Sequence, residues 1–283
     1  FFTIISLNRS SVGSYFFTVF PVTNYFHNPN LYSKNKIMKN YFKAIEEKYQ
    51  VILEPYKRKW IPVLDNSRLN DQSIQIAEDP FNQTFISLDP IDRKKQLEFQ
   101  KYQINYELNK PAIDYYTLLP QSVSNELVDW VKTNKQSRSN TEYLNHILST
   151  FADGSYYYNL SPENNSQNSY ADFFLRGKEG YCEYFAGTFV LLARLANIPS
   201  RIVSGYYGGE LNTVGDFYEF RQRDTHAWAE VWLKGKGWVR VDPTSVIPSS
   251  NVRNSLNNIF NDEDNSTSSI FTLKIFKNLS YYI

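Results

Sequence analysis

Three residues far apart in the sequence, Cys182, His226 and Asp242, have the side chains of a thiol-based catalytic site. Cys182 is the only cysteine of the 283-residue chain, and it stands where a glycine-punctuated segment, 176–181, gives way to an apolar stretch with helical spacing. A helix N-terminus lowers the pKa of a thiol, because it presents free N–H groups and the positive end of the helix dipole. The alternative is a small buried cysteine with no reactivity, since free cysteines are among the most buried residues.

His226 and Asp242 lie on two segments that alternate in polarity, as the strands of a hairpin do. In segment 225–233, the odd positions from 227 onward are small or apolar, and His226 shares the even positions with two tryptophans and a glutamate. Segment 238–242 carries valines at its own odd positions. If these valines join the apolar face, the turn holds an odd number of residues or a bulge, and Asp242 then shares the face of His226.

The three side chains have complementary tasks in a Cys-His-Asp triad. The Cys182 thiolate would attack a carbonyl carbon, and His226 would take and return the proton, because histidine titrates near neutral pH. Asp242 would orient the imidazole and stabilise its charged form. Backbone N–H groups at the start of the helix, including that of Cys182, would stabilise the oxyanion, whereas the sequence identifies no side-chain donor. The alternatives are an ordinary strand histidine and an aspartate that ends a strand before Pro243.

Two aromatic residues and one acid are further candidates around this site. We expect Tyr206 and Trp228 to bind substrate, with packing in the wall or core of the fold as the alternative for each. Glu183 suits the first turn of a helix, but its charge would oppose formation of the Cys182 thiolate. The three histidines are far apart in the sequence, which argues against a metal centre. We therefore expect neither a metal nor a cofactor.

A predicted helix from Cys182 to Ala196 positions the thiol. It ends before Pro199, because the residue preceding a proline avoids helical backbone angles. Segments 123–131 and 141–151 also have helical spacing. The predicted core is therefore a cysteine-bearing helix together with a hairpin that supplies the histidine and the aspartate.

Composition divides the chain into three parts. Residues 1–115 contain short β-prone runs bounded by prolines and polar turns, and they predict a β-rich N-terminal module. Residues 116–250 form the predicted catalytic core, and residues 251–283 a polar linker and tail. Residues 1–7 fit either a first strand or the end of a membrane segment.

The overall charge of +1 gives no field that would attract nucleic acid, so we expect no nucleic-acid partner. Hydrophobic residues make up 42% of the sequence, enough for packed cores. No run reaches the roughly 18 consecutive apolar residues that span a bilayer. Because the first residue is Phe1 rather than Met, we expect a piece of a longer protein, attached to a membrane through flanking segments.

Four motifs resemble the transglutaminase-like superfamily, and more narrowly the bacterial TgpA-type membrane proteins. They are Gly-Tyr-Cys-Glu-Tyr-Phe-Ala around Cys182, segment 193–206, His-Ala-Trp-Ala-Glu-Val-Trp from His226, and Gly-Trp-Val-Arg-Val-Asp-Pro-Thr ending at Thr244. The resemblance implies an α+β fold with a papain-like transglutaminase core, in which the helix carrying the cysteine packs on an antiparallel sheet, preceded by a small β-rich module. It also implies that Cys182, His226 and Asp242 are the triad.

Two positions depart from the family pattern. Asp224 stands before Thr225-His226 where a small residue is more usual, and Tyr207 stands where a polar residue is common. Both departures leave the triad intact and affect the shape of its surroundings.

The predicted activity is thiol-dependent acyl transfer on glutamine side chains or peptide-like amides, through a cysteine thioester. An amine acceptor makes the enzyme a transglutaminase, and water makes it a protease or amidase; the sequence leaves both open. The resemblance implies a protein or peptide substrate and an extracytoplasmic location, periplasmic or at the cell surface, within an inner-membrane or plasma-membrane protein. The alternative is a non-catalytic binding or assembly module with the same fold.

Overall fold

The computed structural model describes residues 2–6, 16–21, 41–70, 74–79, 84–105, 107–162 and 170–252. The chain forms two compact units. The first comprises residues 1–21, 38–107 and 203–226, and the second comprises residues 22–37, 108–202 and 227–283. Each is assembled from separate stretches of sequence. The division of the chain near residues 115 and 250 stays a prediction.

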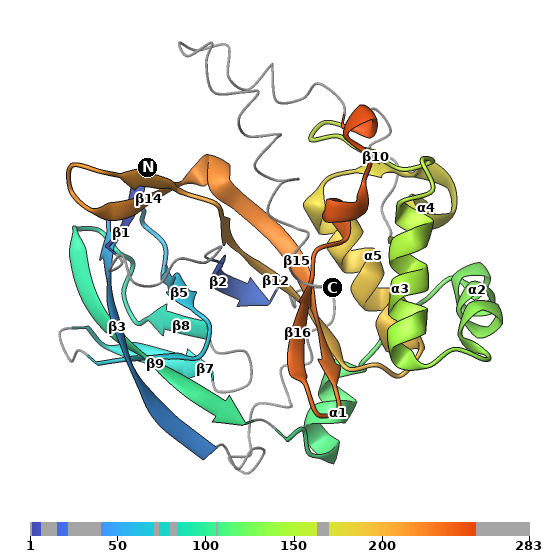
Figure 1. The fold of residues 1–283 in the computed structure, drawn as a ribbon, viewed down its shortest axis with the longest axis horizontal. Helices are drawn as coiled ribbons and strands as arrows, with labels where there is room; N and C mark the ends of the chain where they lie inside the picture. The colour runs from blue at the N-terminus through green and yellow to red at the C-terminus, as the bar shows by residue number, and fades with distance from the viewer. Residues whose placement is uncertain are drawn as a thin grey trace. The chain divides into compact units, whose positions relative to one another are not determined.

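The first unit is built on a six-stranded antiparallel sheet with strand order β13-β14-β1-β3-β9-β6. Its strands are β1 (Phe2–Ser6), β3 (Tyr41–Leu53), β6 (Ser67–Leu69), β9 (Lys95–Asn105), β13 (Glu210–Asn212) and β14 (Phe217–Arg221). The long strands β3 and β9 form a curved antiparallel pair (Figure 1). Residues 2–6 form a strand, which confirms the first of the two interpretations of segment 1–7.

Shorter strands complete the first unit. Strands β4 (Trp60–Ile61), β8 (Thr84–Ser87) and β7 (Ile76–Asp79) form a three-stranded sheet, and β2 (Phe16–Pro21) pairs with β5 (Val63–Leu64). Alternate residues of β3 and β9 are buried with Phe85, and the Tyr49 and Phe99 rings stack at 5.4 Å. Alternation of this kind is what one buried sheet face requires. The predicted β-rich N-terminal region is confirmed.

The second unit contains the helices (Figure 1). They are α1 (Lys110–Tyr116), α2 (Asn125–Lys135), α3 (Asn140–Phe151), α4 (Tyr170–Asp172), which continues into the π-helical turn Phe173–Gly177, and α5 (Cys182–Leu195). The segments predicted at 123–131 and 141–151 correspond to α2 and α3. Helix α3 starts at a capping box, in which Ser139 and Glu142 satisfy each other's backbone N–H groups.

Helix α5 lies in the core of the second unit. Every side chain from Phe185 to Arg194 is buried, which is typical of a helix that is covered on all sides. The Phe185 ring packs edge-on against Phe173 and Phe151. The helix ends at Leu195, where Asn197 adopts a left-handed conformation with φ of 56°. The observed end of the helix, before Pro199, is therefore one residue earlier than the predicted end at Ala196.

The hairpin consists of β15 (Thr225–Leu233) and β16 (Gly237–Val241), and β15 also neighbours β12 (Ser200–Tyr207). Residues Val231 and Val239 face each other in the antiparallel register, as do Ala229 and Val241. The connecting loop, 234–236, has three residues, so the predicted odd loop is confirmed. Because Ala229 and Val231 share a core cluster with α5, the predicted α+β fold, with the helix packed on an antiparallel sheet, is confirmed as well.

Among the described residues, no helix is both long and apolar enough to cross a membrane. The sequence also predicts a polar loop over residues 161–169. Residues 163–169 of this loop, residues 253–283 of the predicted tail, and His27 lie outside the described residues.

Candidate active site

Cys182 is the first residue of α5, and its side chain is partly exposed. Tyr181 precedes it as the N-cap, with extended backbone angles of φ −114° and ψ −176°. The first-turn N–H groups of a helix have no acceptors within the helix, and together with the helix dipole they favour a negative charge at this position. The placement of the thiol at a helix start therefore agrees with the sequence analysis, and it favours the thiolate.

A short parallel pair of strands fixes the approach to α5. Strand β10 (Tyr157–Tyr158) pairs with β11 (Glu179–Gly180), with Tyr158 opposite Gly180. The Asn159 N–H donates to the Gly180 carbonyl at 2.8 Å. A Cβ atom on Gly180 would lie 2.9 Å from Tyr184 Cβ, so only glycine fits this close passage. The pairing brings Tyr158 next to the chain that enters α5.

Tyr158 contacts the candidate nucleophile directly. Its hydroxyl is hydrogen-bonded to the Cys182 side chain and to the Cys182 backbone N–H. Burial raises the pKa of Tyr158 well above its ordinary value, and the charges of Cys182 and Asp242 together with the hydrogen bond to the Cys182 side chain raise it further. Its ring stacks on Phe185 at 6.3 Å. Tyr158 is thus a neutral hydrogen-bond donor beside the thiol.

The sequence analysis did not identify Tyr158. It lies in the run Tyr156-Tyr157-Tyr158, whose composition indicates only a strand. What marks Tyr158 is its position beside the segment that precedes Cys182. That position depends on the β10–β11 pairing.

Glu183 follows Cys182 in the first turn of α5. Burial raises the pKa of its carboxyl group, because a charged carboxylate loses hydration there. This shift acts in the direction that disfavours a negative charge beside the Cys182 thiol.

Asp242 directly follows β16 and caps the 3-10 turn η4 (Pro243–Val246). Its Oδ1 accepts hydrogen bonds from the Thr244 N–H at 3.0 Å and from Thr244 Oγ1 at 2.7 Å. These contacts confirm that Asp242 starts a turn before Pro243, and they also hold its carboxylate in a fixed orientation. Since its charge acts on Tyr158, Asp242 lies near the Cys182–Tyr158 pair.

His226 is the second residue of β15 and is 9% exposed. Its imidazole packs against the Tyr207 ring, with centroids 5.8 Å apart and planes tilted by 39°. Extending the hairpin register by one residue places position 242 opposite Trp228, two residues after His226 on the same strand. Asp242 therefore has the parity predicted for it. Cys182, Tyr158 and Asp242 belong to the second unit, whereas His226 and Tyr207 belong to the first.

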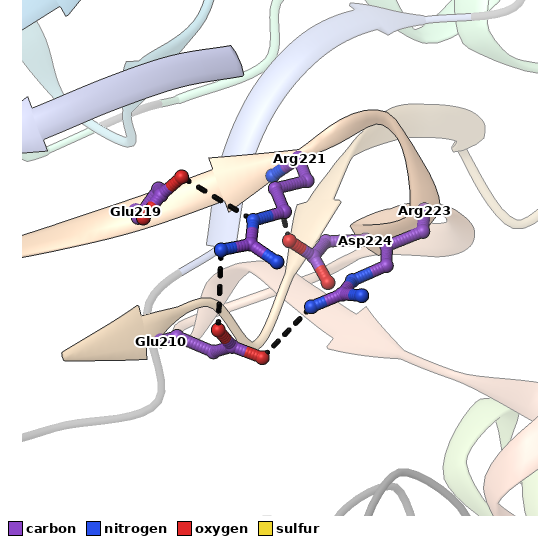
Figure 2. Close-up of polar contacts among 5 residues, drawn as sticks. All are labelled: Glu210, Glu219, Arg221, Arg223 and Asp224. Atoms are coloured by element: carbon purple, nitrogen blue, oxygen red, sulfur yellow. Dashed lines mark hydrogen bonds and ion pairs between the residues drawn. The ribbon is translucent and has the colours of Figure 1, made fainter. Parts of the chain in front are cut away.

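The turn η3 (Gln222–Asp224) leads directly into β15 and is held by several polar contacts (Figure 2). Asp224 Oδ2 accepts a hydrogen bond from the Arg221 N–H at 2.7 Å. Glu210 forms ion pairs with Arg223 at 2.9 Å and with Arg221 at 3.6 Å. Burial raises the pKa of Asp224, although its hydrogen bond to Arg221 acts in the opposite direction.

The two predicted substrate-binding residues have different surroundings. Tyr206 packs against the hydrophobic core of the first unit, where its charged form would raise the pKa of Tyr56. Trp228 is 1% exposed, and the Arg240 guanidinium lies 5.1 Å from the centre of its ring. These contacts are those of wall and core aromatics, the alternative considered for both residues. Substrate binding by Tyr206 and Trp228 stays a prediction.

A buried ion pair joins β12 and β15. Arg201 donates hydrogen bonds to Glu230 Oε2 from Nε at 2.8 Å and from Nη2 at 2.7 Å. Burial alone would raise the pKa of Glu230, but the charges of Arg201 and Arg240 hold it below its ordinary value. The Arg201 guanidinium also covers the Trp238 ring at 4.4 Å. Both contacts are made to the same Glu230 oxygen, and the pair links β12 to β15 within the second unit.

Within the part of the chain that the structure describes, no group of three or more His, Cys, Asp or Glu side chains could hold a metal ion.

The chain is similar in sequence to known proteins. Residues 124–243 match the family model of the transglutaminase-like superfamily. The chain is 27% identical over 222 residues to a protein-glutamine gamma-glutamyltransferase of Pseudomonas aeruginosa, and 26% identical over 158 residues to the uncharacterized protein YebA of Bacillus subtilis. These alignments cover 75% and 54% of this chain, but only 32% and 21% of the relatives. The chain thus spans about a third or less of the curated proteins that it matches.

A solved structure has the same fold. The periplasmic domain of TgpA from Pseudomonas aeruginosa, bound to ethylmercury, superposes with a TM-score of 0.72 at 20% sequence identity. The match covers 88% of this chain and 91% of that domain. At this identity, the superposition establishes the fold of the chain.

Proposed function

The chain contains a transglutaminase-like domain over residues 124–243, and we propose that this domain performs thiol-dependent acyl transfer with Cys182 as its nucleophile. The observation that carries the proposal is the grouping at the start of α5. There the partly exposed Cys182 meets the Tyr158 hydroxyl, with the Asp242 carboxylate close by. A thiol at a helix N-terminus with a hydrogen-bond donor on its sulfur is arranged as a nucleophile.

In the proposed reaction, His226 removes the thiol proton and the Cys182 sulfur forms a bond to the carbonyl carbon of an amide. The tetrahedral intermediate collapses as the C–N bond breaks, and the protonated His226 gives its proton to the departing nitrogen. Asp242 orients the imidazole and stabilises its charge. The resulting thioester is then attacked by an amine or by water, which regenerates the thiol.

Tyr158 contributes to the step in which the C–S bond forms. As the C–S bond forms, negative charge moves from the sulfur to the carbonyl oxygen. We assign that oxygen to the Cys182 N–H and the Tyr158 hydroxyl, the two donors that already meet beside the sulfur. The raised pKa of Tyr158 keeps its proton in place across the physiological range, so it remains a donor throughout the cycle.

The proposed substrate is a glutamine side chain or a peptide-like amide of a protein or peptide. The name of the Pseudomonas relative, a protein-glutamine gamma-glutamyltransferase, supports the glutamine side chain. We also propose an extracytoplasmic location, attached to a membrane through other parts of a longer protein. The fold shared with a periplasmic domain supports this location, as does the length of the curated relatives.

Incubation with a glutamine-containing substrate protein and a labelled primary amine tests the proposal. Incorporation of the label, absent from the Cys182→Ala variant, supports transfer to an amine. Conversion of the glutamine residue to a glutamate residue, with release of ammonia and without incorporation of the label, supports hydrolysis by the same site. If the wild type and the Cys182→Ala variant behave alike in both assays, the domain is a binding or assembly module.

A further inference from the structure

Tyr207 and Asp224 both lie around His226. Tyr207 is the last residue of β12, and its ring contacts the His226 imidazole. Asp224 is the last residue of the turn η3, two residues before His226. All of these residues belong to the first unit, so their arrangement is defined within one compact body.

The Tyr207 contact acts on the orientation of the imidazole. The ring centroids are 5.8 Å apart, so the tyrosine restricts rotation of the histidine ring on one side. A base that must take and return a proton gains from a fixed ring orientation.

The turn before His226 is held by Asp224, by the Thr225 hydroxyl and by Glu210, and Figure 2 shows the contacts of Asp224 and Glu210. Asp224 caps it through the Arg221 N–H, and the Thr225 hydroxyl donates to the Gln222 carbonyl at 2.7 Å. Glu210, on the neighbouring strand β13, forms ion pairs with Arg221 at the beginning of the turn and with Arg223 within it.

The exposure of these groups indicates which contacts restrain the turn most. Glu210 and Arg223 are exposed, and a single exposed ion pair contributes little to stability. Asp224, by contrast, is 8% exposed, so its hydrogen bond to the Arg221 N–H is largely shielded from solvent. One carboxylate bridging two guanidinium groups and a buried cap together form a network, which restrains a short turn better than an isolated pair does.

We propose that Tyr207, Asp224 and Glu210 are positioning residues for His226, one packing on its ring and the other two fixing the turn from which its strand starts. The inference rests on the proposed function in one respect only, namely that His226 serves as a base. The Glu210–Arg221–Arg223–Asp224 network and the Tyr207 ring are called the His226 clamp below.

Proton NMR of the full chain tests the clamp without reference to catalysis. The imidazole Cε1–H signal of His226 is identified by its loss in His226→Gln. We expect Tyr207→Leu to move this signal, because the ring current of the contacting tyrosine is removed, and Tyr207→Phe to restore it. We expect Asp224→Asn and Glu210→Gln to broaden or split the signal, because the turn gains alternative conformations. Glu219→Gln is the matched control, since it removes one ion pair of Arg221 outside the turn.

Alkylation of Cys182 by iodoacetamide at about pH 6 reports the functional consequence, because thiolate at that pH depends on a charged histidine partner. We expect Asp224→Asn and Glu210→Gln to slow alkylation by roughly threefold to tenfold, with Glu219→Gln within about twofold of the wild type. Unchanged His226 signals in Tyr207→Leu, Asp224→Asn and Glu210→Gln overturn the clamp. If His226→Gln alters neither alkylation nor acyl transfer while the signals respond as expected, the clamp holds and the proposed function fails.

Discussion

The Tyr158 hydroxyl is hydrogen-bonded to both the side chain and the backbone N–H of Cys182, because strand β10 pairs in parallel with the strand that leads into α5. The donor and the nucleophile are 24 positions apart in sequence, yet they are held together by a two-residue ladder. The first prediction concerns this pair.

Replacing Tyr158 by phenylalanine removes the hydroxyl and keeps the ring that stacks on Phe185. If the hydroxyl stabilises the oxyanion, kcat for acyl transfer falls by about 10²–10³-fold, as for the loss of one oxyanion donor. Alkylation of Cys182 by iodoacetamide forms no oxyanion, so its rate changes far less. Parallel measurement of the two rates checks this. Equal losses in both would assign Tyr158 to the thiol alone, and no loss in either would remove its catalytic role.

Gly180 should tolerate no side chain. A Cβ atom there would lie 2.9 Å from Tyr184 Cβ, within the first turn of α5. We expect Gly180→Ala to destabilise the fold by about 1–3 kcal/mol, the usual range for overpacking. Urea denaturation followed by circular dichroism measures the loss. Gly154→Ala is a useful comparison, because its Cβ would meet open space and only its positive φ of 87° costs stability.

The buried pair Arg201–Glu230 should be sensitive to loss of the cation. We expect Arg201→Leu to cost about 3–5 kcal/mol of unfolding free energy, because it leaves the Glu230 carboxylate buried with a weaker partner. Lys132→Leu, which breaks an exposed pair with Asp129, should cost no more than about 1 kcal/mol. Similar losses for the two variants would show that the buried pair has no special weight.

The Arg201–Glu230 pair makes the free energy of unfolding depend on pH. The pKa of Glu230 is lowered in the folded state, so the unfolded chain binds its proton at higher pH than the folded chain does. Its contribution to stability is therefore present above the ordinary carboxyl pKa and is lost as the pH falls through the lowered value. Unfolding curves between neutral pH and about pH 3 should show this loss in the wild type and less of it in Glu230→Gln. An identical pH dependence in both proteins would contradict the assignment.

His146 should make the free energy of unfolding depend on pH in a second range, closer to neutral. Its ring stacks on Trp130 at 5.7 Å, and burial, followed by the charge of Arg138, lowers its pKa. The unfolded state then takes up the proton first, so stability falls as the pH drops below the ordinary histidine value of 6.5 toward the lowered one. Denaturant titrations at several pH values should show this slope, and His146→Gln should remove it. If the pH dependence of stability persists in His146→Gln, it arises from another titratable group.

Much of the architecture around the thiol could be predicted from the sequence. The apolar run after Cys182 and Pro199 defined α5 to within one residue of its end, because burial and proline backbone restriction act locally. Alternation in segments 225–233 and 238–242 fixed the hairpin faces and the odd loop, because register follows from a period of two.

What the sequence could not show depends on contacts between distant segments. Tyr158 reaches Cys182 only through the β10–β11 pairing, and a run of three tyrosines indicates no more than a strand. The contribution of residues 203–226 to the β-rich unit arises from pairing of β14 with β1, which no local pattern reveals. The contact between Tyr207 and His226 is likewise a product of tertiary packing.

If Cys182 is the nucleophile, it forms a thioester with the substrate. Peptide mass spectrometry of the chain, quenched in acid soon after mixing with a glutamine-containing peptide, detects this bond. We expect an acyl adduct on the peptide that contains Cys182, absent from Cys182→Ala and removed when a primary amine or water attacks it. An active protein whose Cys182 carries no adduct at any time, or an adduct that persists in Cys182→Ala, would contradict this expectation.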